Sequence, residues 1–553
     1  MPSYQHQRLP YAPPPELSGA PPRRRPVVVV GAGPVGLAAA IDLALHDIDV
    51  LLLDESDTVS IGSRAICWSK RTLEILDRLG CGERMAAKGL TWKVGRVYHG
   101  LREIYSFDLL PEAGHKMPAF INLQQYYVEA YLIDRARALE DRIELRWRSR
   151  VVGLERLSDH VRLAVETPDG PYHVEAGYVL AADGGKSPIR TMLGLDFMGR
   201  VFEERFLITD VVTPVELPHE RRFWFEPPFH EGQSALLHRQ PDNMYRIDLQ
   251  LGPHADPETE KQPERVIPRV KAVLGEGTPF EVEWISVYTF HCRRLERFVH
   301  DRVIFIGDSA HVVSPFGARG GNGGIQDVDN LVWKLALVLK GEAPARLLGT
   351  YDEERAYGAD ENLSNSSRST SFMTPKSAIE REFRDSVLAL AEHLPFARRL
   401  VNSGRLSTPC SLAGMRLQTP DDGAIDGPLV PGSPCADAPV TRADGRPGWL
   451  LEHLGGSFAL LHFGSEAEAP VDLRGLGNLR PELRLLQVNG QGVAQGAGAA
   501  LGDPDGLART RYGGVPGVTY LIRPDQHVAA RFSRFAPEGV RRALARATLK
   551  ETA

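Results

Sequence analysis

Residues 27–54, VVVVGAGPVGLAAAIDLALHDIDVLLLD, predict a strand–turn–helix–strand unit. Four consecutive valines open the stretch, as in a strand buried on both faces. Ala and Leu then recur at helical spacing. Between these elements stand three glycines in G-x-G-x-x-G spacing, Gly31, Gly33 and Gly36. The first would permit a tight turn, the second would let a pyrophosphate approach the backbone, and the third would let helix and strand pack closely.

The second strand of this unit ends in Asp54, eighteen residues after Gly36. An acid at this distance can accept a hydrogen bond from a ribose 2′-hydroxyl. The helix N-terminus would offer unpaired N–H groups and the positive end of its dipole to phosphates. The stretch therefore predicts a dinucleotide site, although the motif alone does not separate FAD from NAD(P).

Composition bounds the class of protein. The 553 residues suggest about three to four domains. With 42% hydrophobic and 25% charged residues, the chain is typical of a soluble globular enzyme. A net charge of −6, without a basic stripe, argues against a nucleic-acid partner. The five cysteines include no C-x-x-C pair, which argues against disulfides or a zinc site and favours a reducing cytoplasm.

The three arginines at 23–25 precede an apolar run and so resemble a twin-arginine export signal. The run contains Pro34, three glycines and Asp42, however, and it is explained by the strand and helix above. Since no other apolar run approaches the length that spans a bilayer, we expect a cytoplasmic protein without membrane association.

Two later apolar strands also end in acids, at Asp183 and at Asp308. A glycine-dense loop follows the second of these and precedes a helix expected at about 325–339. Such a loop lets the backbone approach a flat ligand and directs N–H groups toward it. Because a plain NAD domain needs only the first acid, the additional two favour FAD.

The remaining segments predict further parts. Residues 200–290 contain short strands and turns, which indicate an antiparallel sheet, interrupted by one helix near 262–274. Such sheets commonly form the wall of a ligand pocket. Residues 377–403 are amphipathic and helical in pattern. The tail predicts a small α/β domain with a hairpin turning at 524–526 and a last helix at about 537–549.

Three fingerprints in order, GAGPVG at 31–36, Asp183-Gly184 and GDSAH at 307–311, carry a family resemblance over nearly the full length. The chain resembles class A (single-component) flavoprotein aromatic monooxygenases of the p-hydroxybenzoate hydroxylase fold. The segments NLVWKLALVLKG and YLIRPDQHVAARF are most similar to the 3-(3-hydroxyphenyl)propionate hydroxylase-like subgroup.

This resemblance implies an α/β fold: a Rossmann-like FAD-binding domain, an inserted mixed or antiparallel-sheet substrate domain, and a C-terminal thioredoxin-like α/β domain. Because the tail has no C-x-x-C, we expect it to serve structure or oligomerisation rather than redox chemistry. The expected divisions are a disordered or loosely docked leader at 1–25, the FAD-binding domain at 26–90, 115–195 and 295–375, the substrate domain at 91–114 and 196–294, a helical segment at 376–403, a linker at 404–435, and the thioredoxin-like domain at 436–553.

The resemblance also implies cofactor contacts. Family members often have two prolines and a Gly-Gly-Gln run where this chain has Ser314-Pro315 and residues 317–319, GAR, which changes local contacts but not the fold. The implied FAD contacts are Gly31, Gly33, Gly36 and Arg64 at the pyrophosphate, Asp54 at the adenosine ribose, Gln125 at the ribityl or pyrophosphate region, Asp183 and Gly184 in a motif associated with both FAD and NAD(P)H, Asp308 at the ribityl chain, and Pro315, Gly320, Gly321 and Asn322 along the flavin ring.

The implied reaction uses NAD(P)H to reduce FAD and O₂ to form a flavin C4a-hydroperoxide, which hydroxylates a phenolic or aromatic-acid substrate. The strands SALLHRQ and NMYRIDLQ resemble the substrate-binding hairpin of the fold. A histidine or tyrosine there could relay the phenol proton, and an arginine could pair with a carboxylate. The candidates are His238, Arg239, Tyr245 and Arg246, with Pro315 beside the flavin; for His311 we favour a structural role.

The expected partners are therefore a small aromatic molecule and O₂, with a homodimer as the possible oligomer and with neither nucleic acid nor metal. Two alternatives remain open. One is an FAD-dependent reductase or dehydrogenase of the same fold that inserts no oxygen, and the other is a non-catalytic FAD-binding interaction protein. A flavin halogenase is disfavoured because the sequence lacks W-x-W-x-I-P.

Overall fold

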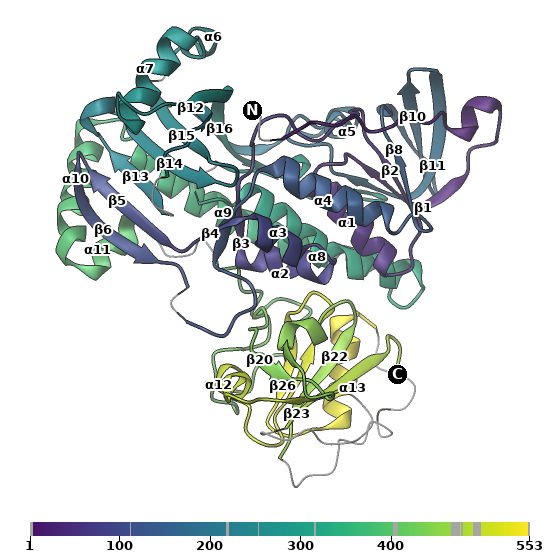
Figure 1. Ribbon diagram of the computed structural model, residues 1–553. Helices are drawn as coiled ribbons and strands as arrows, with labels where there is room; N and C mark the ends of the chain where they lie inside the picture. Colours follow the sequence, from purple (N-terminus) through teal and green to yellow (C-terminus); the bar gives the residue numbers. More distant parts are fainter. Residues whose placement is uncertain are drawn as a thin grey trace.

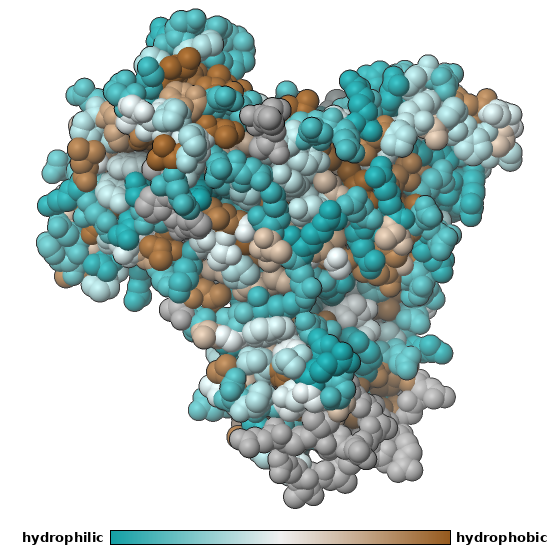
Figure 2. Space-filling view, in the orientation of Figure 1, coloured by the Kyte–Doolittle hydropathy of each residue, from teal (hydrophilic) through white to brown (hydrophobic). Residues whose placement is uncertain are grey.

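The protein is a mixed α/β chain whose strands form four sheets within the described residues (Figure 1). On the face shown in Figure 2, hydrophobic residues lie in small groups among hydrophilic ones. No helix in the described part of the chain combines the length and the apolar character needed to cross a membrane. The computed structural model describes residues 4–110, 112–216, 220–252, 254–314, 317–401, 408–465, 476, 479–489 and 499–550.

The first sheet confirms the strand–turn–helix–strand prediction. Strand β1 (Arg24–Val30) leads into α1 (Pro34–Leu45) and β2 (Val50–Leu53). Strand β1 pairs in parallel with β2 and with β11 (Gly170–Ala181), so the carboxyl ends of all three meet at one edge, where open α/β sheets bind ligands. The sheet order is β17-β18-β11-β1-β2-β8, with β17 (Val299–His300), β18 (Val303–Phe305) and β8 (Ile143–Arg146); β10 (Val161–Thr167) and β9 (Arg150–Arg156) extend it from β11.

Helices α4 (Gln125–Arg137) and α8 (Gly320–Leu339) pack against α1. Helix α8 begins five residues earlier than its sequence pattern predicted, because glycines disfavour helices on propensity alone. Packing explains the difference: a Cβ at Gly324 would lie 2.6 Å from Cγ2 of Val35. Close contact between α8 and α1 therefore requires glycine in this first part of the helix.

The second sheet is the predicted, mostly antiparallel one. Helix α7 (Pro263–Leu274) covers one face, and α9 (Gly349–Met373) and α10 (Ala378–His393) lie against the other at one end. A three-stranded sheet, β3 (Cys67–Ser69), β7 (Phe120–Asn122) and β4 (Leu90–Trp92), stands between the two large sheets. The order of the second sheet is β19 (His311–Val312), β16 (Glu281–Arg294), β12 (Met198–Val212), β15 (Met244–Leu251), β14 (Ser234–Gln240), β13 (Arg221–Phe225), β5 (Val94–His99) and β6 (Arg102–Asp108).

The C-terminal part forms a separate seven-stranded sheet (yellow-green in Figure 1). The predicted hairpin is confirmed: β25 (Thr519–Ile522) and β26 (Val528–Phe532) pair antiparallel. Helix α13 (Pro537–Ala547) follows. The strand order is β21 (Pro447–Trp449), β20 (Pro439–Thr441), β24 (Ala499–Gly502), β23 (Leu483–Asn489), β22 (Phe458–Phe463), β25 and β26, in which β22, β23 and β24 run parallel.

The turn between β25 and β26 enters a buried ionic cluster below α8, which we call the interdomain cluster. Arg523 on this turn holds both carboxylate oxygens of Glu354 on α9, at 2.6 and 2.9 Å. Lys334 on α8 contacts the same carboxylate at 2.7 Å, and burial lowers the pKa of Lys334 to about 8. Arg71, on α2 (Lys70–Arg78), pairs with Asp329 and reaches the turn. Charged side chains thus fasten the C-terminal sheet to the first domain.

The segments expected to be irregular are partly ordered. In the leader, the Tyr4 ring lies 4.5 Å from that of Tyr126 on α4, and Arg8 pairs with Asp57, so the described part of this arm packs onto the first domain. Helices α10 and α11 (Pro395–Val401) occupy the expected helical segment. Residues 408–435 contain no helix or strand.

Candidate cofactor and substrate site

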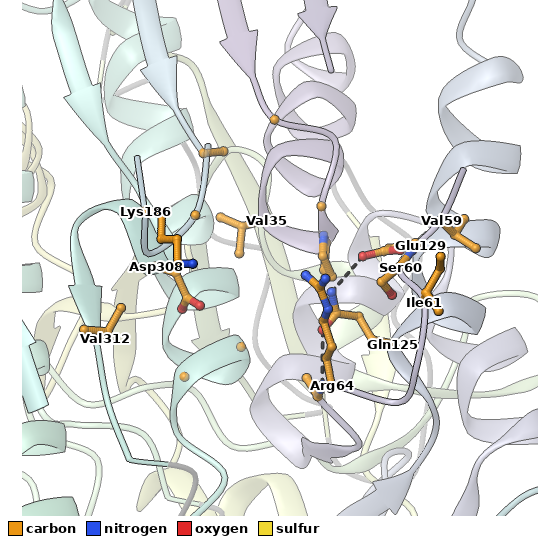
Figure 3. A pocket seen from close by; sticks show the side chains of 18 of the residues that line it. Val35, Val59, Ser60, Ile61, Arg64, Gln125, Glu129, Lys186, Asp308 and Val312 are labelled. Atoms are coloured by element: carbon orange, nitrogen blue, oxygen red, sulfur yellow. Dashed lines mark hydrogen bonds between the residues drawn. The ribbon is translucent and has the colours of Figure 1, made fainter. Parts of the chain in front are cut away.

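A cavity of about 1360 Å³ lies between the two large sheets. It is bounded by the carboxyl ends of β1, β2 and β11, the first turns of α1 and α8, and one face of the second sheet. Pro315 falls outside the described residues, and Gly36 lies beneath the wall. Figure 3 shows part of the lining. The other predicted cofactor residues all line the cavity: Gly31, Gly33, Asp54, Arg64, Gln125, Asp183, Gly184, Asp308, Gly320, Gly321 and Asn322.

The three glycines of the β1–α1 turn occupy three different environments. Gly31 has φ +106°, and a Cβ there would lie 2.4 Å from the Ala182 carbonyl oxygen. A Cβ at Gly36 would lie 1.8 Å from the Gly31 oxygen, whereas one at Gly33 would meet nothing within 4 Å. Gly31 thus permits the turn, Gly36 permits close packing of helix and strand, and Gly33 leaves space for a ligand to approach the backbone. Helix α1 has no side-chain N-cap, so its first N–H groups are available to a ligand.

Asp54 stands at the end of β2, in the wall of the cavity. Its carboxylate accepts hydrogen bonds from the backbone N–H groups of Ala32, at 2.5 Å, and Ser56, at 2.7 Å. Burial raises the pKa of Asp54, while these two N–H groups oppose the rise. The two bonds fix the orientation of the carboxylate and leave lone pairs that can accept from a hydroxyl.

Arg64 and Gln125 lie together on one side of the cavity (Figure 3). Gln125 accepts a hydrogen bond from the Ala65 N–H at 3.1 Å and donates to Glu129 at 2.7 Å; Glu129 in turn accepts from the Ser60 N–H. This chain of bonds holds the loop that carries Arg64. The Arg64 side chain is exposed in the cavity and forms no ion pair with the described residues. Its guanidinium is therefore free to bind phosphate oxygens.

Asp183 and Asp308 approach the cavity from the other side. One oxygen of Asp183 accepts from the Ile189 N–H at 3.0 Å, while Oδ1 is buried without a hydrogen bond. Asp308 points into the cavity near Lys186 (Figure 3), and no described residue hydrogen-bonds to its carboxylate. Burial within the surrounding protein raises the pKa of both groups. Both carboxylates can therefore accept hydrogen bonds from hydroxyl groups of a ligand.

A buried ionic group supports the turn that presents Asp308. Asp327 accepts from the Gly307 N–H at 2.9 Å and pairs with His311 and Arg355, each at 2.7 Å. Against the opposing effect of burial, the neighbouring His311 and Arg355 hold the pKa of Asp327 below its usual range. His311 is fully enclosed and lies beneath the turn, a placement that agrees with the structural role we favoured.

Asn322, in the first turn of α8, connects two elements beside the cavity. Its side chain accepts from the Ser69 N–H at 2.9 Å and donates to the carbonyl oxygens of Cys67 and Ala318. Helix α8 itself has no side-chain N-cap. The site fits a dinucleotide that carries phosphates and hydroxyls, as FAD does. Phosphates suit the uncapped N-termini of α1 and α8 and the open space at Gly33, and a hydroxyl can donate to the unpaired oxygen of Asp183.

Four polar side chains form a row across the second sheet, which we call the polar row. Strand pairing sets His238 on β14 opposite Arg246 on β15, and Arg246 opposite Asp210 on β12. Arg221 on β13 extends the row beyond His238, because its neighbour Arg222 is paired with Leu237. Since side chains alternate between faces, all four lie on the cavity side of the sheet.

Within the polar row, Arg246 has charged and polar partners, whereas Nδ1 of His238 has none among the described residues. Arg246 donates to Asp248 at 2.7 Å and to the Arg64 carbonyl oxygen at 2.7 Å, so this guanidinium links the sheet to the cofactor loop. Burial raises the pKa of Asp210 to about 6, against the influence of Arg246. Burial and the two arginines hold the pKa of His238 well below its usual value, and its Nδ1 has no hydrogen bond. His238 is therefore neutral at pH 7.

Two of the predicted substrate-side residues lie away from the cavity. Tyr245 and Arg239 project from the opposite face of the hairpin, where the Tyr245 hydroxyl donates to the Val215 carbonyl oxygen and Arg239 pairs with Glu216. The sequence identified the hairpin but not which alternate residues face inward. It also gave no role to Arg221, Asp248 or Glu129; strand alternation along RRFWF was the only sequence signal for Arg221.

Comparisons with known proteins agree with the site. The FAD binding domain family matches residues 24–366. The 3-(3-hydroxy-phenyl)propionate/3-hydroxycinnamic acid hydroxylase of Burkholderia cenocepacia is 28% identical over 447 residues, 81% of this chain and 80% of that protein. The 12-dehydrotetracycline 5-monooxygenase/anhydrotetracycline 6-monooxygenase of Streptomyces rimosus is 35% identical over 350 residues, 60% of this chain and 66% of that protein.

The fold is also found among solved structures. That of the flavin-dependent monooxygenase PieE, in complex with FAD and substrate, covers 95% of this chain and 100% of its own, with a TM-score of 0.77 and 21% identity. At this identity the likeness concerns the fold. The family matches more than half of this chain, and the cavity fits FAD. The chain therefore belongs to the FAD binding domain family, among relatives that are flavin-dependent aromatic hydroxylases.

Proposed function

We propose that this protein is an FAD-dependent monooxygenase that uses NAD(P)H and O₂ to hydroxylate a phenolic or aromatic-acid substrate. The observation that carries the proposal is the single cavity that joins a dinucleotide cradle to the polar row. A non-catalytic FAD-binding protein would need the first part only. An enclosed polar wall facing the cofactor is what an oxygen transfer to an aromatic ring requires, because the ring must be oriented and water excluded.

Bound FAD would supply the redox chemistry, accepting a hydride from NAD(P)H and activating O₂. Gly33 and Arg64 would hold its pyrophosphate, Asp54 its adenosine ribose and Asp308 its ribityl chain. The first N–H groups of α8 would face the pyrimidine edge of the flavin ring. All of these groups line the cavity and are open to it.

His238 is our candidate for the proton acceptor from a phenol. Its imidazole is neutral and enclosed, and Nδ1 has no protein partner. A phenol becomes a better nucleophile toward electrophilic oxygen as its proton is withdrawn, so a neutral base beside the ring would favour the reaction. Arg246 is committed to Asp248 and to the cofactor loop, and we assign it a positioning role.

We also propose the division of the chain into an FAD-binding domain, an inserted substrate domain and a thioredoxin-like tail with the boundaries given above. For the tail, the order β26-β25-β22-β23, with β22 and β23 parallel and a final helix, supports a thioredoxin-like arrangement. Its role would be structural, through the interdomain cluster.

The test is NAD(P)H oxidation by the FAD-loaded protein with a panel of phenols and phenolic acids, with products identified by mass under ¹⁸O₂. We expect one compound to stimulate oxidation and to gain one labelled oxygen atom. The His238→Asn variant should retain FAD but form this product more slowly. Tyr245→Phe, altered on the opposite face of the same hairpin, is the matched control and should retain the rate.

Two outcomes would contradict the proposal. Stimulated oxidation that yields only H₂O₂ with every phenol and phenolic acid of the panel would show that no oxygen is transferred. Reduction of an organic acceptor without consumption of O₂ would favour the reductase alternative. NADH and NADPH should be run in parallel as the hydride donor.

A further inference from the structure

Arg221 is a cation in the cavity that the protein itself does not neutralise. It is half-buried, lies at the end of the polar row, and forms no ion pair or hydrogen bond with any residue in the described ranges. Its nearest described aromatic contact is the Trp92 ring, with Cζ 5.9 Å from the ring centre. Surrounding protein lowers the pKa of its guanidinium, which is nevertheless charged at pH 7.

The acids around Arg221 are engaged elsewhere. Asp248 pairs with Arg246 at 2.7 Å, and Asp210 accepts from Gln240 at 3.2 Å. His238, its neighbour in the row, is neutral and contributes no negative charge. An unpaired cation away from bulk water is costly, so proteins seldom retain one without a partner. The missing partner is therefore an anion that enters the cavity.

The cofactor has its own cation. Arg64 lies beside Gln125, on the loop that Arg246 holds through the Arg64 carbonyl oxygen, and its side chain is open to the cavity (Figure 3). Arg221 instead belongs to the substrate wall, next to the candidate base His238. A guanidinium presents two parallel N–H donors that match the two oxygens of a carboxylate.

We propose that Arg221 binds the carboxylate of an aromatic acid and so selects anionic substrates. This inference rests on the proposed function, because it places the acid in the cavity that would also hold FAD. Relatives of this chain act on both phenylpropionate-type acids and tetracycline-type ring systems, and Arg221 assigns this chain to the acids.

The experiment measures binding to the FAD-loaded protein without NAD(P)H, by the change in flavin absorbance on titration. The probes are pairs of an acid and its neutral counterpart: 3-(3-hydroxyphenyl)propionate with its methyl ester, and 3-hydroxybenzoate with 3-hydroxybenzamide. The variants are Arg221→Met and Arg221→Lys. Arg222→Met is the matched control, because Arg222 is adjacent on β13, faces the other side and pairs with Glu220 at 2.8 Å.

We expect wild type to prefer at least one acid over its neutral partner. Arg221→Met should weaken binding of that acid by about 10- to 100-fold, the range for a charge-assisted pair, and should leave the neutral partner and the FAD content unchanged. Arg221→Lys should recover part of the loss, since it restores charge without the paired donors. Arg222→Met should behave as wild type.

Equal weakening of acid and neutral partner would overturn the proposal, since it would indicate lost packing or an interaction with the phenol oxygen. Absence of any preference for acids in wild type would also overturn it, even if the protein proved to be a monooxygenase. Conversely, Arg221-dependent binding of an acid that yields no oxygenated product would refute the proposed function and leave the carboxylate site standing.

Discussion

Replacing Gly33 and Gly36 separately by alanine should distinguish the cofactor approach from the packing of the turn. At Gly33 the backbone has φ −70°, which alanine adopts freely, and the added methyl group meets no protein atom within 4 Å. Gly33→Ala should therefore cost less than about 1 kcal/mol in the unfolding free energy of the FAD-free protein. The methyl group would instead stand where the pyrophosphate must approach, and we expect FAD affinity to fall about tenfold or more, equal to about 1.4 kcal/mol.

At Gly36 the added methyl group would lie 1.8 Å from the Gly31 carbonyl oxygen. Helix α1 would have to move by more than about 1 Å to restore van der Waals distance. Overpacking of this kind costs about 1–3 kcal/mol or more, a substantial share of a typical stability of about 5–15 kcal/mol. Gly36→Ala should therefore destabilise the protein whether or not FAD is present.

The assay is urea unfolding of the FAD-free proteins together with FAD titration by flavin fluorescence. Gly33→Ala should change the second measurement alone, whereas Gly36→Ala should change both. If Gly33→Ala bound FAD as tightly as wild type, the assignment of this position to the pyrophosphate would be refuted. Unfolding of Gly36→Ala at wild-type urea concentrations would refute the packing argument.

Three other predictions concern buried polar groups. Arg523→Met should lower the unfolding free energy by about 3–5 kcal/mol, because two buried carboxylates, Glu354 and Asp525, lose their main partner. Lys334→Met should cost about 1–2 kcal/mol, since Arg523 still holds Glu354. Urea unfolding compares the two variants. The pKa of Asp210 is raised in the folded state, so the folded protein binds more protons than the unfolded chain between about pH 4 and pH 6. Its unfolding free energy should therefore fall as pH rises through that window. In Asp210→Asn this fall should be smaller, and an unchanged pH profile would contradict the raised pKa of Asp210. Tyr245→Phe should lose about 0.5–1.5 kcal/mol of stability with its bond to Val215 while substrate KM stays at the wild-type value; a raised KM would place Tyr245 in the substrate site after all.

Most of the residues predicted from the sequence to bind the cofactor meet in one cavity, and their sequence signals are local. The glycine spacing, the acids that end β2, β11 and β18, and the helix after the second glycine loop each lie within a short segment. Their meeting follows from parallel strands sharing one edge. Arg64 could be assigned only through the resemblance, since an isolated arginine before a helix carries no local signal.

The substrate half depended on information that a single sequence lacks. Strand alternation shows which residues share a face of the sheet, but not which face borders the cavity. In the structure that is settled by helix α7, which covers the other face. His238 and Tyr245 were therefore equally eligible, and only His238 faces the cavity. Arg221 reaches the polar row through the register between β13 and β14, which the pattern of either strand alone does not show. The interdomain cluster had no sequence signal at all, because its members come from four separate elements.

Helix α8 connects the cavity to the C-terminal sheet. Its 20 residues span about 30 Å. Its first turn lines the cavity, and its later turns carry Asp329, Trp333 and Lys334 to the interdomain cluster and the core beneath it. We therefore expect substitutions in the tail that displace the later turns of α8 to shift its first turn beside the cavity as well. A variant library intended to change cofactor binding should therefore include residues at the C-terminal end of α8 as well as the residues that line the cavity. A chain shortened before 436 would remove the C-terminal sheet, on which Trp333 of α8 packs, and with it the Arg523 side of the interdomain cluster.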